Sequence, residues 1–180
     1  MPTGSQIPDT AVSSDSTAAD GAFVLSRVFE APRALVYEAW TEPEALAQWW
    51  GPKGFKIRIA KLDFRPGGVF HYAMQLPNGN EMWGRFVYRE IVPSERIVFV
   101  NSFSDENESV TRHPMCTTWP LEVLSTVEFA DQEDKTVLTL SGVPINPIDE
   151  ERKTFEAGRE SMRMGFRGTL DQLGEYLARS

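Results

Sequence analysis

The sequence predicts an α+β fold in which a curved antiparallel β-sheet of about six to seven strands wraps around a long C-terminal α-helix. Three observations support this prediction. Residues 54 to 145 alternate apolar runs with turn sequences, the last 34 residues carry a helical apolar stripe, and two short helical segments follow the first strand. A sheet with one apolar face needs a cover, which a long helix can supply.

The first strand and the two short helices occupy residues 22 to 50. AFVLSRVFE, at 22 to 30, is rich in Phe and Val and ends before Pro32, a residue that suits the first turn of a helix. Residues 32 to 41 then carry one apolar stripe at helical spacing. A second helix is predicted to begin after Thr41 and to stop at Gly51-Pro52.

The middle of the chain predicts an antiparallel meander. R-P-G-G at 65 to 68, P-N-G-N at 77 to 80 and P-S-E-R at 93 to 96 are turn sequences that bend the chain back between apolar runs. The polar stretch 104 to 118 indicates a long loop, and two more strands are expected at 120 to 129 and 135 to 145. Such a sheet exposes one apolar face that must be covered.

The C-terminal segment predicts that cover. From Pro147 onward, large apolar residues recur at spacings of seven, four, four, three and four: Phe155, Met162, Phe166, Leu170, Leu173 and Leu177. A helix of about 30 residues is about 45 Å long, enough to cross a sheet. Gly165 and Gly168 each cost about 0.8 to 1 kcal/mol against Ala, and we expect them to make room for the sheet or for a ligand.

Composition narrows the classes of function. Eighteen Lys and Arg against 26 Asp and Glu give a net charge of −8, which disfavours nucleic acid and anionic membrane surfaces as partners. One cysteine fits a reducing cytoplasm. Residues 1–21 are predicted to form a disordered acidic tail and residues 22–180 a single domain. No apolar run approaches the length of a membrane span.

The adjacent Trp49 and Trp50 raise a question of orientation. Neighbouring helical residues point about 100° apart, so both cannot sit at the centre of one narrow stripe. Both can still pack in the core around the short helices. The alternative places one indole in the core and the other against a cavity between sheet and helix, and we take Trp50 as the second.

A ligand pocket is predicted between the sheet and the last helix. Alternation along VFHYAMQL puts large side chains on one face of that strand. The predicted wall consists of Trp50, Phe70, Tyr72, Met74 and Trp83, facing Met162, Phe166 and Leu170. The alternative is a filled core, because Met and aromatic side chains are ordinary gap fillers.

Motifs for catalysis or metal binding are sparse. The sequence has no G-x-S-x-G, no phosphate-binding loop, no dinucleotide fingerprint and no H-E-x-x-H. His113 and Cys116 are three apart, but two ligands rarely make a zinc site. We therefore predict no metal and no cofactor. Acid or base chemistry would have to come from His71, Tyr72, Tyr88 or His113.

Three segments together resemble a known family: RVFEAPRALVYEAWTEPEALAQWWGP, RPGGVFHYAM and GTLDQLGEYL. They are similar to the domain related to the activator of the heat-shock protein 90 ATPase, within the START-related, birch-pollen-allergen-like helix-grip superfamily. The resemblance runs from about residue 22 to 180 and implies a helix-grip fold. The loop at 110 to 120 also resembles a loop of bacterial family members. This resemblance implies that Arg112, His113 and Trp119 lie at the pocket mouth. A solvated loop with Trp119 against the sheet edge is the alternative.

The resemblance leaves three classes of function. The leading hypothesis is a cytoplasmic module that binds or senses a small, mostly apolar or amphipathic ligand. The second is a co-chaperone that binds a chaperone and stimulates its ATPase, although eukaryotic activators carry an additional N-terminal domain and about 21 residues precede the fold here. The third is an enzyme acting on an aromatic substrate, similar to polyketide cyclases, which needs a polar pair inside the cavity.

Overall fold

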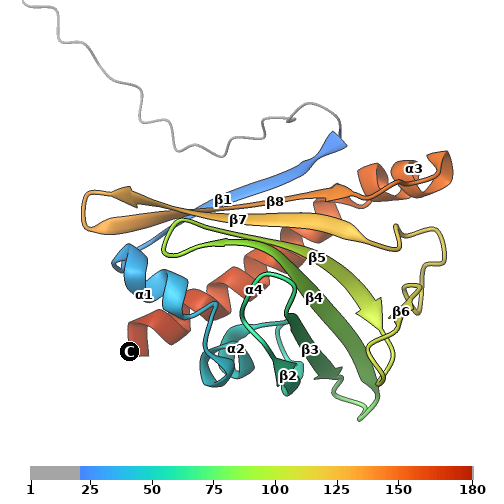
Figure 1. The fold of residues 1–180 in the computed structure, drawn as a ribbon, viewed down its shortest axis with the longest axis horizontal. Coiled ribbons are helices and arrows are strands. Elements are labelled where there is room, and N and C mark those ends of the chain that lie inside the picture. The colour runs from blue at the N-terminus through green and yellow to red at the C-terminus, as the bar shows by residue number, and fades with distance from the viewer. Residues whose placement is uncertain (1–20, 180) are drawn as a thin grey trace, which may run out of the picture.

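A computed structural model of the chain describes residues 21–179 and confirms the predicted α+β helix-grip architecture (Figure 1). The predicted tail, residues 1–21, lies outside the described residues apart from Gly21. The elements, in chain order, are β1 (Phe23–Phe29), α1 (Arg33–Glu38), α2 (Pro43–Trp49), β2 (Lys56–Leu62), β3 (Val69–Gln75), β4 (Glu81–Val92), β5 (Arg96–Ser104), β6 (Val110–Thr111), β7 (Val123–Gln132), β8 (Lys135–Pro144), α3 (Asp149–Ala157) and α4 (Arg159–Arg179).

The strands form one antiparallel sheet in the order β1-β8-β7-β5-β4-β3-β2, with the two-residue β6 paired to β5. The sheet is a meander from β2 to β5 and from β7 to β8, because each turn sequence joins neighbouring strands. The first strand, β1, lies beside the last, β8. The connection that carries α1 and α2 therefore spans the whole width of the sheet.

The helices cover one face of this curved sheet. Figure 1 shows α4 running across that face, with α1 and α2 on the same side toward its C-terminus. Aromatic rings from neighbouring strands pack beneath them, and the Phe86 and Phe99 rings stack with centroids 4.0 Å apart. Leu170 and Leu173 of α4 are almost fully buried against this layer. We call this covered side the inner face.

The predicted single C-terminal helix is two helices, and this is a correction. The helix is interrupted at Gly158, between α3 and α4, where the backbone adopts φ −86° and ψ 1°. A Cβ at Gly158 would lie 3.0 Å from the Trp119 ring, a tighter contact than most Cβ atoms make, so glycine favours the close packing of this loop. The apolar spacing continues through the break, which is why periodicity alone did not reveal it.

Gly165 and Gly168 do not serve the close approach that we expected of them. A Cβ built on either residue meets nothing within 4 Å beyond the helix itself. Gly165→Ala is therefore expected to raise the free energy of unfolding by about 0.5 to 1 kcal/mol through helix propensity, measured by urea denaturation. Gly158→Ala, which crowds Trp119, should not stabilise the protein. A loss of stability in Gly165→Ala would contradict the open environment.

Candidate functional site

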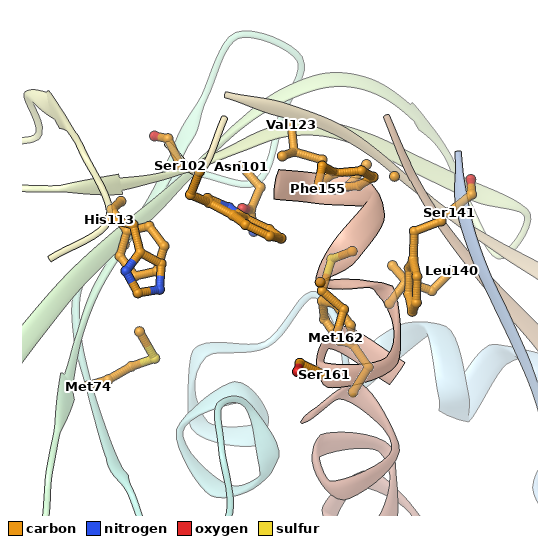
Figure 2. Close-up of a pocket in the computed structure, with 18 of the residues that line it drawn as sticks. Met74, Asn101, Ser102, His113, Val123, Leu140, Ser141, Phe155, Ser161 and Met162 are labelled. Atoms are coloured by element: carbon orange, nitrogen blue, oxygen red, sulfur yellow. The ribbon is translucent and has the colours of Figure 1, made fainter. Parts of the chain in front are cut away.

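A cavity of about 400 Å³, partly open to solvent, lies between the inner face of the sheet and the α3–α4 region (Figure 2). Strands at the β1–β8–β7 side, β3 to β5, and the loop after β6 all contribute to it. The lining residues are Phe23, Tyr72, Met74, Gly84, Asn101, Ser102, Phe103, His113, Trp119, Val123, Ser125, Leu140, Ser141, Gly142, Phe155, Gly158, Ser161, Met162 and Phe166. Its volume is within the range of small-molecule sites.

The wall is mainly apolar. The Phe23 ring of β1 packs on the Phe166 ring of α4, with centroids 5.8 Å apart, and closes one side. Met162 lies one helical turn before Phe166, so both side chains share the same face of α4. Figure 2 shows Met162 opposite His113 and Met74, with Leu140 on the β8 side. This part of the wall therefore consists mainly of apolar side chains.

Glycine on β4 shapes the cavity beside Tyr72. Gly84 pairs with Tyr72, and a Cβ at Gly84 would lie 2.6 Å from the tyrosine oxygen. The hydroxyl therefore occupies space that any other residue at 84 would fill. Burial raises the pKa of Tyr72 to about 12, against a smaller opposing effect of the Trp50 indole. Tyr72 is thus a neutral phenol at physiological pH.

The loop between β6 and β7 contributes His113 and Trp119 to the cavity wall. The Trp119 ring packs on Phe155 of α3 with centroids 5.4 Å apart, and the His113 ring lies 4.6 Å from Phe103 of β5. His113 Nδ1 accepts the Met115 backbone N–H at 3.0 Å, which leaves Nε2 to carry the ring hydrogen. Burial lowers the pKa of His113, which favours the neutral ring.

Arg112 does not line the cavity. It pairs with the buried carboxylate of Glu151, near the start of α3, and donates a further bond of 3.3 Å to the Trp119 carbonyl. Thr154 of α3 also donates to the Thr118 hydroxyl at 2.8 Å. Arg112 therefore fastens the loop to α3 and is not part of the cavity wall.

The Arg112–Glu151 pair predicts a pH-dependent contribution to stability. Arg112 and the Ile148 backbone N–H hold the pKa of Glu151 below its ordinary value. The contribution is therefore present above the ordinary pKa of about 4.3 and is lost as pH falls through the lower folded value. Glu151→Gln is expected to lower the free energy of unfolding by about 1 to 2 kcal/mol at pH 7. The loss is no larger because solvent screens the half-exposed Arg112.

Urea denaturation at pH 7, 5, 4 and 3 measures this contribution. The gap between wild type and Glu151→Gln should shrink toward the acid end. A gap that stays constant across the series would show that the carboxylate charge is not what Arg112 recognises.

Three predicted wall residues lie in the core instead. Trp50, Phe70 and Leu170 are 8%, 0% and 1% exposed and do not border the cavity. Leu170 is one turn beyond Phe166, where α2 closes against α4: Gln172 donates to the Trp49 and Gly51 carbonyls. Helical spacing assigns the face correctly but carries no information on where along the helix the cavity ends.

The tryptophan pair is also resolved by this packing. Trp49 is fully buried and donates its indole N–H to the Ala39 carbonyl at 2.9 Å. Trp50 packs edge-on against Phe86, with ring centroids 5.2 Å apart. Both indoles therefore belong to the core, and the choice of Trp50 as the cavity-facing residue is wrong.

Trp83 lies on the opposite face of the sheet. It pairs with Ala73, whereas Tyr72 pairs with Gly84, so alternation directs Trp83 away from the cavity. There it stacks on His71 at 4.6 Å, and Arg58 lies over its ring at 5.0 Å. His71 Nε2 is 3.0 Å from the Asp105 carbonyl oxygen. Of the candidate acid–base groups, His71 is therefore separated from Tyr72 by the sheet.

The remaining predicted residues come together. Six of them line the cavity: Tyr72, Met74, His113, Trp119, Met162 and Phe166. Sequence reasoning missed Phe23, Asn101, Leu140, Phe155 and Ser161, which also line it. A signal existed for Phe155, which begins the C-terminal apolar stripe. Asn101 and Ser161 belong to no motif. Their place in the cavity wall follows only from the strand register of β5 and from the position of α4.

Two further findings concern metals and membranes. Within residues 21–179, no group of three or more His, Cys, Asp or Glu side chains is arranged to hold a metal ion. None of the helices in this part of the chain combines the length and apolar character that a membrane crossing needs.

Comparisons with known proteins place the chain in a family. No curated protein matches it. A solution structure from Arthrobacter aurescens shares 24% identity, with a TM-score of 0.73 over 88% of this chain and 87% of that one. A crystal structure from Chromobacterium violaceum shares 24% identity (TM-score 0.67; 86% and 95%), and the AHSA1 protein from Silicibacter pomeroyi shares 18% (0.67; 87% and 97%).

These structures support the fold alone, whereas the family model supports membership. The model described as Activator of Hsp90 ATPase homolog 1-like protein matches residues 30–178. That range contains the strands, helices and loop that form the cavity, apart from Phe23 on β1. The chain therefore belongs to the Activator of Hsp90 ATPase homolog 1-like protein family.

Proposed function

We propose that this protein is a cytoplasmic module that binds or senses a small, mostly apolar ligand in the cavity between the sheet and α4. The observation that supports the proposal is the cavity of about 400 Å³ with an apolar wall, formed by Phe23, Leu140, Met162 and Phe166 among others. Family membership agrees with a binding module. In this proposal the helices and the Trp119 loop hold the wall in shape, and binding needs no chemical step.

The expected affinity follows from the apolar area that a ligand can bury. About ten CH₂-sized groups gain roughly 8 kcal/mol on burial, and association consumes at least about 4 kcal/mol of this. A ligand of this size without polar anchors would therefore bind with about millimolar affinity at best. Titrations must reach millimolar concentrations to detect it.

A cavity-blocking variant tests the proposal. Met162 lines the cavity, whereas Met164 on the same helix is 69% exposed and does not. Met162→Trp is expected to weaken binding of small uncharged aromatic compounds at least about tenfold by filling the space. Met164→Trp, the matched control, should bind as wild type does. Isothermal titration calorimetry measures both, and circular dichroism checks their folding.

Two results would contradict the proposal. Equal affinities in folded Met162→Trp and Met164→Trp would place the binding site elsewhere. Saturable binding by none of the compounds, at millimolar concentrations, would argue against an internal ligand.

The family description supports a second candidate, a chaperone ATPase activator. An ATPase assay with the host's own chaperone tests it, and stimulation that rises and saturates with this protein would favour it over the ligand-binding function. Because Met162 lies in the cavity wall, Met162→Trp should leave such stimulation unchanged.

A further inference from the structure

Asn101 on β5 and His113 on the loop after β6 are two hydrogen-bonding side chains of the cavity wall, which also carries hydroxyl groups on β3, β7, β8 and α4. Asn101 is directly opposite Phe86 on β4 and Val123 on β7, so it belongs to the inner face. Figure 2 shows Asn101 extending into the cavity from the sheet, across from Ser161 and Met162 on α4. Within residues 21–179, no protein group hydrogen-bonds its side-chain amide. The amide can thus both donate to a ligand and accept from it.

His113 adds a donor beside Asn101. Phe103 lies two residues after Asn101 on the same face of β5, and the His113 ring packs on it at 4.6 Å. The Nδ1 atom is occupied by the Met115 N–H, so the Nε2–H remains to donate. Asn101 and His113 are therefore both near Phe103, and together they offer an acceptor and donors to one polar end of a ligand.

Charge distinguishes this wall from its surroundings. Each described residue that lines the cavity is either apolar or a neutral polar residue, given the neutral ring of His113. Arg112 and Glu151, which fasten the loop after β6 to α3, neutralise each other. A charged group placed inside would lose its water without gaining a partner of opposite charge, which is strongly unfavourable.

We propose that the cavity selects an uncharged ligand whose polar end both donates and accepts hydrogen bonds, as a carboxamide or a hydroxyl does, held by Asn101 and His113. This inference rests on the proposed binding function and narrows its ligand class. It excludes carboxylates, phosphates and amines that are ionised at neutral pH.

Three ligands of one shape test the selection. The probes are 2-naphthamide, 2-naphthoate and 2-naphthylmethylammonium, which share the ring and differ in charge at the polar end. At pH 7, calorimetry should find the carboxamide at least about tenfold tighter than either ion. A carboxylate that binds as tightly as the carboxamide overturns the inference and leaves the binding function standing. If none of the three probes binds saturably at millimolar concentration, the proposed binding function and this inference both fail.

Variants of Asn101 test its part in the contact. Asn101→Leu keeps the size of the side chain, and it should weaken 2-naphthamide about three- to tenfold by removing a hydrogen-bonding partner. Asn107→Leu, at an exposed turn position, is the control and should not change the affinity.

A second variant guards against misfolding of Asn101→Leu. Asn101→Asp is nearly isosteric and introduces a negative charge, so it should shift the preference from 2-naphthoate toward 2-naphthylmethylammonium. Unchanged relative affinities in this variant would overturn the assignment of Asn101.

Discussion

Trp49→Ala is expected to lower the free energy of unfolding by about 3 to 5 kcal/mol. Trp49 is fully buried, its ring lies 4.8 Å from that of Trp40, and its N–H bonds the Ala39 carbonyl at 2.9 Å. Truncation leaves a cavity where α2 joins the sheet and an acceptor without its donor. Since α2 is also fastened to α4 through Gln172, the loss reaches both helices.

Urea denaturation measures the Trp49 effect against a matched tryptophan. Trp83→Ala, on the opposite face, should cost about 1 kcal/mol, as partly exposed positions do. Trp49→Phe retains one ring and removes the indole N–H with part of the buried volume, so its loss should be smaller than that of Trp49→Ala. Equal losses for Trp49→Ala and Trp83→Ala would refute the assignment of Trp49 to the core.

Gly68→Ala is expected to cost about 3 kcal/mol, at or above the upper end of overpacking effects. A Cβ at Gly68 would lie 2.0 Å from the Asp63 carbonyl oxygen, and this neighbour is backbone, so it cannot rotate away. The same turn pairs with β4: Tyr88 donates to the Gly68 carbonyl at 3.0 Å. Relief of the clash therefore requires movement of the β2–β3 connection.

Gly67→Ala provides the control for Gly68. Gly67 has φ +83° and open space around its Cβ position, so its substitution costs only the left-handed strain, about 1 to 2 kcal/mol. Urea denaturation should give Gly68→Ala a clearly lower free energy of unfolding than Gly67→Ala. The reverse order would mean that the turn relaxes without loss.

Much of the fold could be predicted because local chemistry agrees with the tertiary structure. R-P-G-G, P-N-G-N and P-S-E-R each join neighbouring antiparallel strands, and Gly51-Pro52 follows the C-cap residue of α2. The break at Gly158 could not be predicted, because Gly158 packs closely on Trp119, which lies in a loop far away in the sequence. Contacts between segments far apart in sequence leave no local pattern.

The site was predictable only where one periodicity sufficed. Alternation placed Tyr72 and Met74, and helical spacing placed Met162 and Phe166, on faces that border the cavity. The prediction for Trp83 was wrong because the face on which it lies depends on the register between β3 and β4, which pairs Trp83 with Ala73. The prediction for Arg112 was wrong because its partner, Glu151, lies 39 residues away in the sequence. Neither relation is contained in a single segment.

The ¹⁵N spectrum of the tryptophan indoles during ligand titration tests the central claim most directly. Trp119 lines the cavity, whereas Trp83 lies on the opposite face and Trp49 is bonded to Ala39 in the core. With 2-naphthamide, saturable shifts of the Trp119 indole and of amides from Ser161 to Phe166 are predicted, with Trp83 unmoved. Shifts confined to Trp83, or none at millimolar ligand, would contradict an internal binding site.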